Sequence, residues 1–372
     1  MKALRFGRAA AVISVAALAL TACGSDNAVD SGTEGGSSAA PESTVSGTLT
    51  GAGASSQQAA MTAWQAGFEG LNPEATVQYS PDGSGAGREA FLAQGVQFAG
   101  SDAYLDDEEY EASKEICGPD GAINIPAYVS PIAVAFNVPG VEELNLDAAT
   151  IASIFKGEVS NWNDEAIAAQ NEGVELPDLP ITVVHRADES GTTENFVEYL
   201  AAAAPEQWTY EVSGDWPADI VAENAQGTNG VVSTTSSTEG AITYTDASAV
   251  GDLGQALVKV GEEYVALSPE AASRAVEVAT PVDEGRNDVD MSLDLERDTT
   301  ESGAYPIVLI SYHLYCTTYE DQETVDLVKA FGSYVISEEG QQDAADSAGN
   351  APISETLREQ AQEAIDSIQV AS

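Results

Sequence analysis

Short runs of β-branched and aromatic residues alternate with amphipathic runs of helical period from residue 48 to the end of the chain. This alternation predicts strands and helices in succession, which is typical of the α/β class. Strands are expected at 75–80, 96–102, 122–138, 181–186, 242–250 and 305–316, with a hairpin at 256–267. Helices are expected at 87–95, 106–116, 147–157, 164–170, 193–204, 321–346 and 353–368.

Two strand-like stretches stand out by their length, residues 126–138 and residues 305–315. They are the natural places for the chain to cross from one lobe to another and to return. This topology predicts a first lobe of residues 48–128 and 303–372, with a second lobe of residues 129–302 inserted between its two parts. Prolines within the first stretch are expected to bend it.

The N-terminus has the composition of a secretory signal. Basic residues precede an apolar run that is short for a membrane span, and Leu20-Thr21-Ala22 leads into Cys23. Small residues directly before a cysteine resemble the lipobox of bacterial lipoproteins. This implies removal of residues 1–22 and a lipid-anchored, diacylated Cys23 outside the cytoplasmic membrane; an ordinary signal peptide with an incidental cysteine is the alternative. Residues 23–47, rich in Gly and Ser, predict a flexible tether.

The chain is strongly acidic, with 61 acidic and 13 basic side chains and a formal net charge of −48. Residues 1–22 contain three of the basic side chains and no acidic one, so their removal makes the protein more acidic still. Such a surface argues against nucleic acid and anionic membrane surfaces as partners. Because basic side chains are few, an arginine in a cleft is a candidate for binding a ligand.

The remaining two cysteines, Cys117 and Cys316, form an even pair in an oxidising compartment, which favours a disulfide over two buried free thiols. His185 and His313 have no cysteine or histidine at ligand spacing. We therefore expect no metal site and no cofactor.

Three segments share a polar turn that runs into a helix pattern, and two of them contain glycine-rich turns. Helix N-termini expose unpaired N–H groups and bind anions, and hydroxyl groups add donors. Ordinary helix capping explains any one segment alone, whereas three together favour convergence on one anion. The candidate residues are Ser55 and Ser56 in the first turn, Ser84 in the second, and Arg186, Asp188, Ser190, Gly191 and Thr192 in the third.

Asp102 ends a predicted strand and complicates this anion site. A carboxylate near an anion is unfavourable unless it accepts a hydrogen bond from a proton on the ligand. The alternative is that Asp102 caps the helix predicted at 106–116. Glu189 and Glu194 are interpreted as solvated acids.

The segments GAGAS, DGSGAG, FAGSDAYL, IFKGEVSNWND, HRADESGTTENF and GAITYTDAS together resemble the extracellular phosphate-binding protein of the bacterial phosphate ABC importer. The resemblance runs from about residue 48 into the last helices. It implies a two-lobed periplasmic-binding fold that closes on dehydrated inorganic phosphate, a monomer that delivers it to membrane permease subunits, and no catalytic activity.

The same resemblance implies roles for the candidate residues. Serine donors from the first lobe would hold phosphate together with donors from 190–192, Asp102 would accept a proton of the ligand, and Asp188 would orient Arg186. The Ser55-Ser56 pair departs from the commoner Thr-Phe, which removes apolar shielding. The alternatives are the same fold tuned to sulfate or molybdate, a serine hydrolase or phosphatase built on Ser190 and His185, and an adhesion lipoprotein that has lost binding.

Overall fold

The computed structural model describes residues 45–282 and 285–371. The predicted signal peptide, Cys23 and most of the predicted tether lie outside these residues. The principal strands are β1 (Gly47–Gly53), β2 (Ala75–Ser80), β3 (Phe98–Ser101), β4 (Ala122–Phe136), β5 (Glu143–Leu146), β6 (Thr182–Arg186), β7 (Glu223–Ala225), β8 (Ala241–Asp246), β9 (Gly254–Val260), β10 (Glu263–Val265) and β13 (Val308–Cys316). Four further strands of two residues each form two separate two-stranded sheets: β11 (Thr280–Pro281) pairs with β12 (Leu293–Asp294), and β14 (Thr318–Tyr319) pairs with β15 (Gln369–Val370).

Helices separate most of these strands. They are α1 (Gln58–Leu71), α2 (Ser84–Leu92), α3 (Asp107–Cys117), α4 (Ala148–Phe155), α5 (Glu165–Ala168), α6 (Gly191–Ala203), α7 (Gly227–Ser237), α8 (Pro269–Val276), α9 (Gln322–Ile336), α10 (Glu338–Ala348) and α11 (Glu355–Ser367), with short 3-10 helices η1 (Ser55–Gln57) and η2 (Ala247–Ala249). The predicted α/β class is confirmed.

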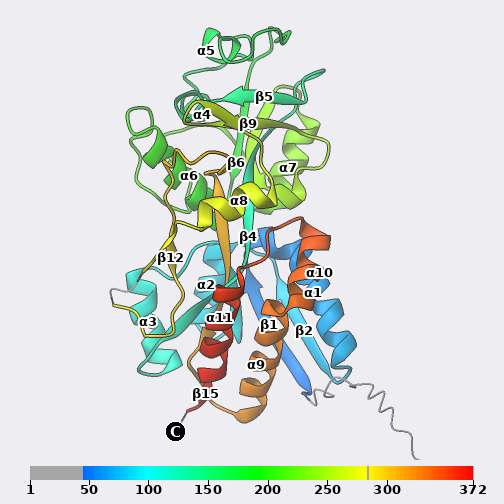
Figure 1. Cartoon of the computed structure of the whole chain (residues 1–372), viewed down its shortest axis with the longest axis vertical. Helices are drawn as coiled ribbons and strands as arrows, with labels where there is room; N and C mark the ends of the chain where they lie inside the picture. The colour runs from blue at the N-terminus through cyan, green and yellow to red at the C-terminus, as the bar shows by residue number, and fades with distance from the viewer. Residues whose placement is uncertain (1–44, 283–284, 372) are drawn as a thin grey trace, which may run out of the picture. The chain divides into compact units, whose positions relative to one another are not determined.

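The first lobe is built on the strand order β2-β1-β3-β13-β4. Strand β1 pairs in parallel with β2 and β3, and β13 pairs antiparallel with β3 and β4. Helices α9 and α10 pack with α1, α11 packs with α9, and α2 packs on β1 and β3 (Figure 1). The disulfide between Cys117 and Cys316 ties the end of α3 to the end of β13, as predicted.

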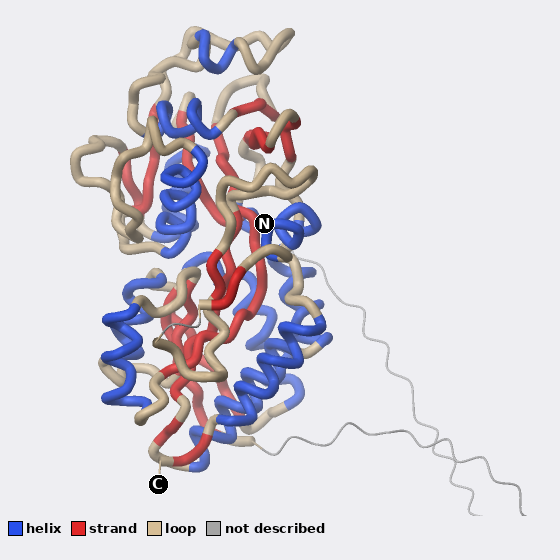
Figure 2. Tube along the Cα trace, turned by 60° about the vertical axis from the view of Figure 1, so that its left-hand side comes forward, coloured by secondary structure: helices blue, strands red, loops and turns tan. Residues whose placement is uncertain are grey.

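The second lobe continues the sheet through the C-terminal part of β4 in the order β4-β8-β6-β7. Strands β6, β7 and β8 are parallel, and β9 forms the predicted hairpin with β10. Strands run through the middle of both lobes with helices outside them (Figure 2). This two-lobed arrangement confirms the expected fold.

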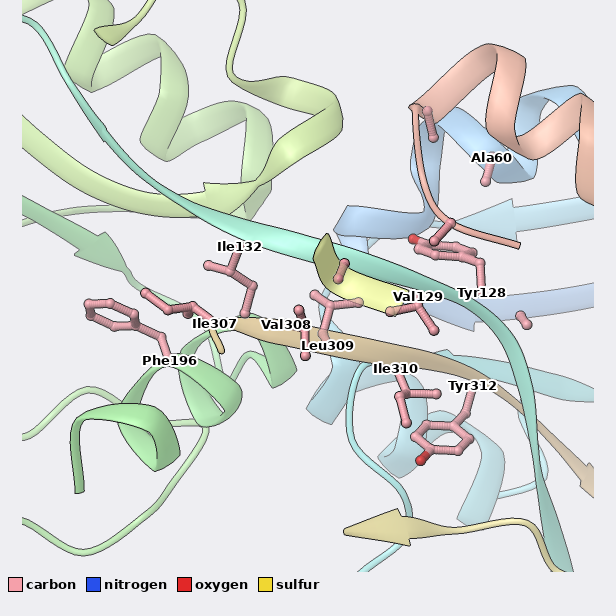
Figure 3. Packing of buried hydrophobic residues seen from close by; sticks show 14 of the residues in the cluster. Ala60, Tyr128, Val129, Ile132, Phe196, Ile307, Val308, Leu309, Ile310 and Tyr312 are labelled. Carbon is pink, nitrogen blue, oxygen red and sulfur yellow. The ribbon is translucent and has the colours of Figure 1, made fainter. Parts of the chain in front are cut away.

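Strand β4 connects the two lobes as one strand of 15 residues, all buried. Residues 122–131 pair with β13, whereas residues 132–136 pair with β8. The register with β13 shifts between Ser311 and Tyr312, whose partners are Tyr128 and Pro126, so that Ala127 is the extra residue of a β-bulge. The expected bend at proline is thus a bulge beside Pro126. Figure 3 shows the buried apolar residues that follow the two strands across this region: Tyr128, Val129, Ile132, Val308, Leu309 and Ile310.

Local sequence explains most helix boundaries. Asp106 caps α3 in a capping box with Glu109, and Asp164 caps α5, which is only four residues long. The single helix expected at 321–346 is divided at Ser337, which ends α9 and caps α10. Helices α7 and α8 were not predicted.

Candidate functional site

Four helical segments begin at one place between the lobes. From the first lobe come η1, which leads into α1, and α2, whose first residue is Ser84. From the second lobe come α6, capped by Ser190, and α7, which begins at Gly227. Because helix N-termini carry partial positive charge and free N–H groups, their meeting forms an environment suited to an anion.

Asp102 lies at the end of β3 with only 3% of its surface exposed. Its Oδ2 accepts hydrogen bonds from Ser56 Oγ (2.6 Å) and Thr192 Oγ1 (3.1 Å), and its Oδ1 accepts from Ser311 Oγ (2.7 Å). Burial raises the pKa of Asp102, while these hydroxyl donors and nearby Arg186 oppose the rise. The side chain does not cap α3, so the capping alternative is wrong.

The second lobe approaches Asp102 through the start of α6. A Cβ added at Gly191 would lie 2.7 Å from Asp102 Cβ and 2.8 Å from Ser84 Oγ, so only glycine permits this approach. Ser84 Oγ also accepts a hydrogen bond from the Asp102 backbone N–H at 3.2 Å. Asn195 Nδ2 donates to the Asp102 carbonyl oxygen at 2.7 Å, which fixes the strand end.

Arg186 ends β6 and is 3% exposed. Its Nε donates to Asp188 Oδ1 at 2.9 Å and its Nη2 donates to Asp188 Oδ2, a two-point contact that orients the guanidinium. Asp188 Oδ1 also accepts from the Gly227 backbone N–H at 2.9 Å. Gly83 of the first lobe faces this carboxylate with a φ of 116°, and a Cβ there would lie 2.7 Å from Asp188 Oδ2.

The remaining predicted residues have other partners. Ser55 Oγ accepts from the Thr228 backbone N–H at 3.0 Å and lies 3.0 Å from Thr228 Oγ1, so it joins η1 to α7. Ser190 Oγ accepts from the Thr193 backbone N–H at 3.3 Å as the cap of α6. The hydroxyl groups of Ser55 and Ser190 both lie at the junction between the lobes.

The structure corrects the interpretation of Glu189 and Glu194 as solvated acids. Glu189 Oε1 accepts from Arg88 Nη2 at 2.5 Å, and the Arg88 side chain is only 8% exposed. Burial raises the pKa of Glu194 to about 7, with Arg88 opposing that rise. Both acids therefore belong to the junction between the lobes.

A cavity of about 230 Å³ opens beside Asp102. Residues of both lobes and of the segment before β13 line it, among them Asp102, Glu194, Asn195, Arg297 and Tyr312. Arg297 is held by Glu198, whose Oε2 accepts from its Nη2 at 2.7 Å. The cavity thus lies beside Asp102 and is lined in part by charged and polar side chains.

Sequence reasoning missed three residues of the site: Ser311, Thr228 and Asn195. No local signal linked these side chains to Ser55 or Asp102. His185 was weighed as a catalytic base, yet its ring stacks on Trp216 with centroids 5.1 Å apart, and its Nδ1 lies 2.7 Å from the Arg186 carbonyl oxygen.

Within residues 45–282 and 285–371, no cluster of three or more His, Cys, Asp or Glu side chains is arranged to hold a metal ion. Among the helices of this same part of the chain, none is long and apolar enough to cross a membrane. Fold and site together define a two-lobed binding protein whose candidate anion site lies between the lobes.

Comparison with known proteins identifies the family within this class of binding proteins. Residues 38–339 match the family model described as a PBP superfamily domain. Phosphate-binding protein PstS 3 of Mycobacterium leprae is 37% identical over 96% of this chain and 97% of its own length. PstS 3 of Mycobacterium tuberculosis is 36% identical over 99% of this chain and 100% of its own length.

Solved structures show the same fold. A high-affinity periplasmic phosphate-binding protein, PfluDING, bound with phosphate, superposes with a TM-score of 0.68 at 21% identity, covering 85% of this chain and 93% of that one. The chain belongs to the PstS family within the PBP superfamily.

Proposed function

We propose that this protein binds inorganic phosphate outside the cytoplasmic membrane and delivers it to an ABC permease. The observation that carries the proposal is a buried carboxylate, Asp102, at a junction of helix N-termini that otherwise supplies donors. Two relatives named phosphate-binding proteins, which match nearly the whole chain, support the same function.

The donor and acceptor pattern selects phosphate among oxyanions. Phosphate near neutral pH carries at least one proton, which the Asp102 carboxylate can accept as a hydrogen bond. Sulfate carries none, so its oxygen would face the carboxylate lone pairs without a proton between them. A buried charged group left unpaired costs several kcal/mol, which corresponds to discrimination of roughly a thousandfold.

The predicted residues then take defined roles. Arg186, oriented by Asp188, makes the charge-assisted contact. Donors come from Ser55, Ser56 and Ser84 of the first lobe and from residues 190–192 of the second, with Ser56 and Thr192 donating through their backbone N–H groups because their hydroxyl protons go to Asp102. The chain passes between the lobes twice, in β4 and in the segment before β13, and closure bends it at these two crossings. One lobe consists of residues 48–128 and 303–372, and the other of residues 129–302.

We further propose a monomer anchored through a lipid on Cys23, with no catalytic step. The arrangement of Ser190 supports the last point, because its Oγ caps α6 while the His185 ring stacks on Trp216. Ser190 and His185 thus contact other groups, whereas a serine hydrolase requires its nucleophile and base to contact each other.

Calorimetry on protein stripped of ligand tests the function. We expect submicromolar phosphate binding, with sulfate failing to compete at large excess. Asp102→Asn should reduce the discrimination between phosphate and sulfate more than it weakens phosphate binding, since an amide can donate to either anion. Heat with sulfate but none with phosphate would contradict the proposal.

A further inference from the structure

A buried chain of hydrogen bonds runs along one face of β13 to the Asp102 carboxylate. Residues two apart on a strand share a face, and Ser311, His313 and Tyr315 do so here. Gln57, from η1, bridges the first two: its Nε2 donates to Ser311 Oγ at 2.8 Å, and its Oε1 lies 3.2 Å from His313 Nε2. We call this chain the Asp102 relay; its members are Tyr315, His313, Gln57, Ser311 and Asp102.

The direction of the relay follows from one backbone carbonyl. Gln57 Nε2 also lies 3.0 Å from the Tyr312 carbonyl oxygen, which can only accept a hydrogen bond. The opposite amide orientation would place two acceptors against each other, so the nitrogen of Gln57 must face Tyr312. Gln57 Oε1 is therefore an acceptor, and His313 Nε2 carries the proton that it accepts.

The same accounting extends to both ends. Burial lowers the pKa of His313 to about 3, so the ring is neutral and its Nδ1 accepts from Tyr315 Oη at 3.0 Å. Ser311 Oγ accepts from Gln57 and has one proton left, which it donates to Asp102 Oδ1 at 2.7 Å. Every hydrogen bond in the relay thus points toward Asp102.

We propose that the Asp102 relay determines specificity by committing the Ser311 proton to Asp102 and so keeping that carboxylate a hydrogen-bond acceptor. Ser311, Gln57 and His313 act as positioning residues, because none of them needs to touch the ligand. Ser56 and Thr192 donate to the other carboxylate oxygen. A carboxylate offers about four acceptor positions. The three hydroxyls that donate to it in the described structure leave room for one proton of the ligand.

The inference rests on the proposed phosphate function, and one set of calorimetric titrations separates the two. The measured quantity is the ratio of the sulfate Kd to the phosphate Kd. Ser311→Ala removes the donor to Asp102 and should lower this ratio roughly ten- to a hundredfold, as expected for a hydrogen bond to a charged group. Ser311→Thr keeps the hydroxyl group and should retain the wild-type ratio.

Gln57→Met tests whether the effect depends on the relay as a whole rather than on Ser311 alone. It releases the Ser311 hydroxyl and should lower the ratio about three- to tenfold, in line with the loss of one neutral hydrogen bond. Gln341→Met is the matched control, because Gln341 is also buried and its Nε2 donates to two carbonyl oxygens, those of Ala127 and Val335, rather than to a member of the Asp102 relay. This control should lose stability and keep the ratio.

The outcomes are distinct. A wild-type protein that fails to bind phosphate refutes the proposed function itself. Normal phosphate binding with an unchanged ratio in both Ser311→Ala and Gln57→Met overturns the relay. A fall in the ratio for Ser311→Ala alone, or an equal fall in Gln341→Met, also overturns it, since the effect would then not pass through Gln57.

Discussion

The ion pair between Arg88 and Glu189 provides a quantitative test of closure. Arg88 lies on α2 of the first lobe, and Glu189 follows β6 of the second lobe; Nη2 and Oε1 are 2.5 Å apart. Glu189 also covers Gly85, where an added Cβ would lie 1.2 Å from its Oε2. Under the proposed hinge motion this contact exists only in the closed state, so Glu189→Gln should shift the protein toward the open state.

The size of the effect follows from the exposure of the two groups. Exposed ion pairs contribute about 0.2–1 kcal/mol, whereas a hydrogen bond to a charged group contributes about 1.5–3 kcal/mol. The Glu189 side chain is 35% exposed, and Arg88 retains Glu109 as a partner at 2.8 Å. We therefore expect a loss of about 1 kcal/mol, which raises the phosphate Kd roughly fivefold.

Calorimetry and stopped-flow fluorescence measure this change. Most of it should appear as faster dissociation, because the pair stabilises the complex after the lobes have closed. Glu158→Gln is the control, since it removes an exposed pair with Lys156 that lies within one lobe. A phosphate Kd for Glu189→Gln within twofold of wild type, or tighter binding, would refute this account of closure.

Two further predictions concern neighbours of the site. Trp216 stacks on His185 next to Arg186, so Trp216→Phe should remove most of the phosphate-induced change in tryptophan fluorescence; an undiminished change would assign the signal to another tryptophan. Burial raises the pKa of Glu194 from 4.5 to about 7, so the folded state holds this proton more tightly than the unfolded state, and stability falls as pH rises from about 4.5 to about 7. Glu194→Gln should flatten that decline in urea unfolding at pH 5 and pH 8, and an equal decline in both proteins would count against it.

The strands and most helices could be predicted because their signals are local. Apolar runs identify β2, β6 and β8, and polar caps identify the starts of α3 and α6. Helix α7 escaped prediction because its sequence, GTNGVVSTTSS, consists largely of poor helix formers. It packs against β6 and β8, so tertiary contacts stabilise a helix that intrinsic propensity does not favour.

The site was predictable in its residue types but not in its pairings. The polar residues and glycines that begin a helix are adjacent in the sequence, so Ser84 and Gly191 could be identified from it. The partner of Asp102 on β13, Ser311, lies 209 positions away in the chain, and nothing near either residue encodes the contact. Glu189 was misjudged for the same reason, since its burial depends on the approach of a distant Arg88.

The balance of charges around Asp102 shows how an acidic protein can hold an anion. Arg186 makes the charge-assisted contact proposed above, but Asp188 offsets its positive charge in a two-point contact. Asp102 adds a further carboxylate, so the immediate site has two acids against one arginine. Much of the attraction must then come from neutral donors, the hydroxyls and backbone N–H groups at four helix starts. Dipoles at hydrogen-bonding distance act over a few ångströms, whereas surface acids beyond a Debye length of about 8 Å are screened by salt. Selectivity therefore depends on which ligand atoms carry protons, rather than on the net charge of the protein or of the ligand.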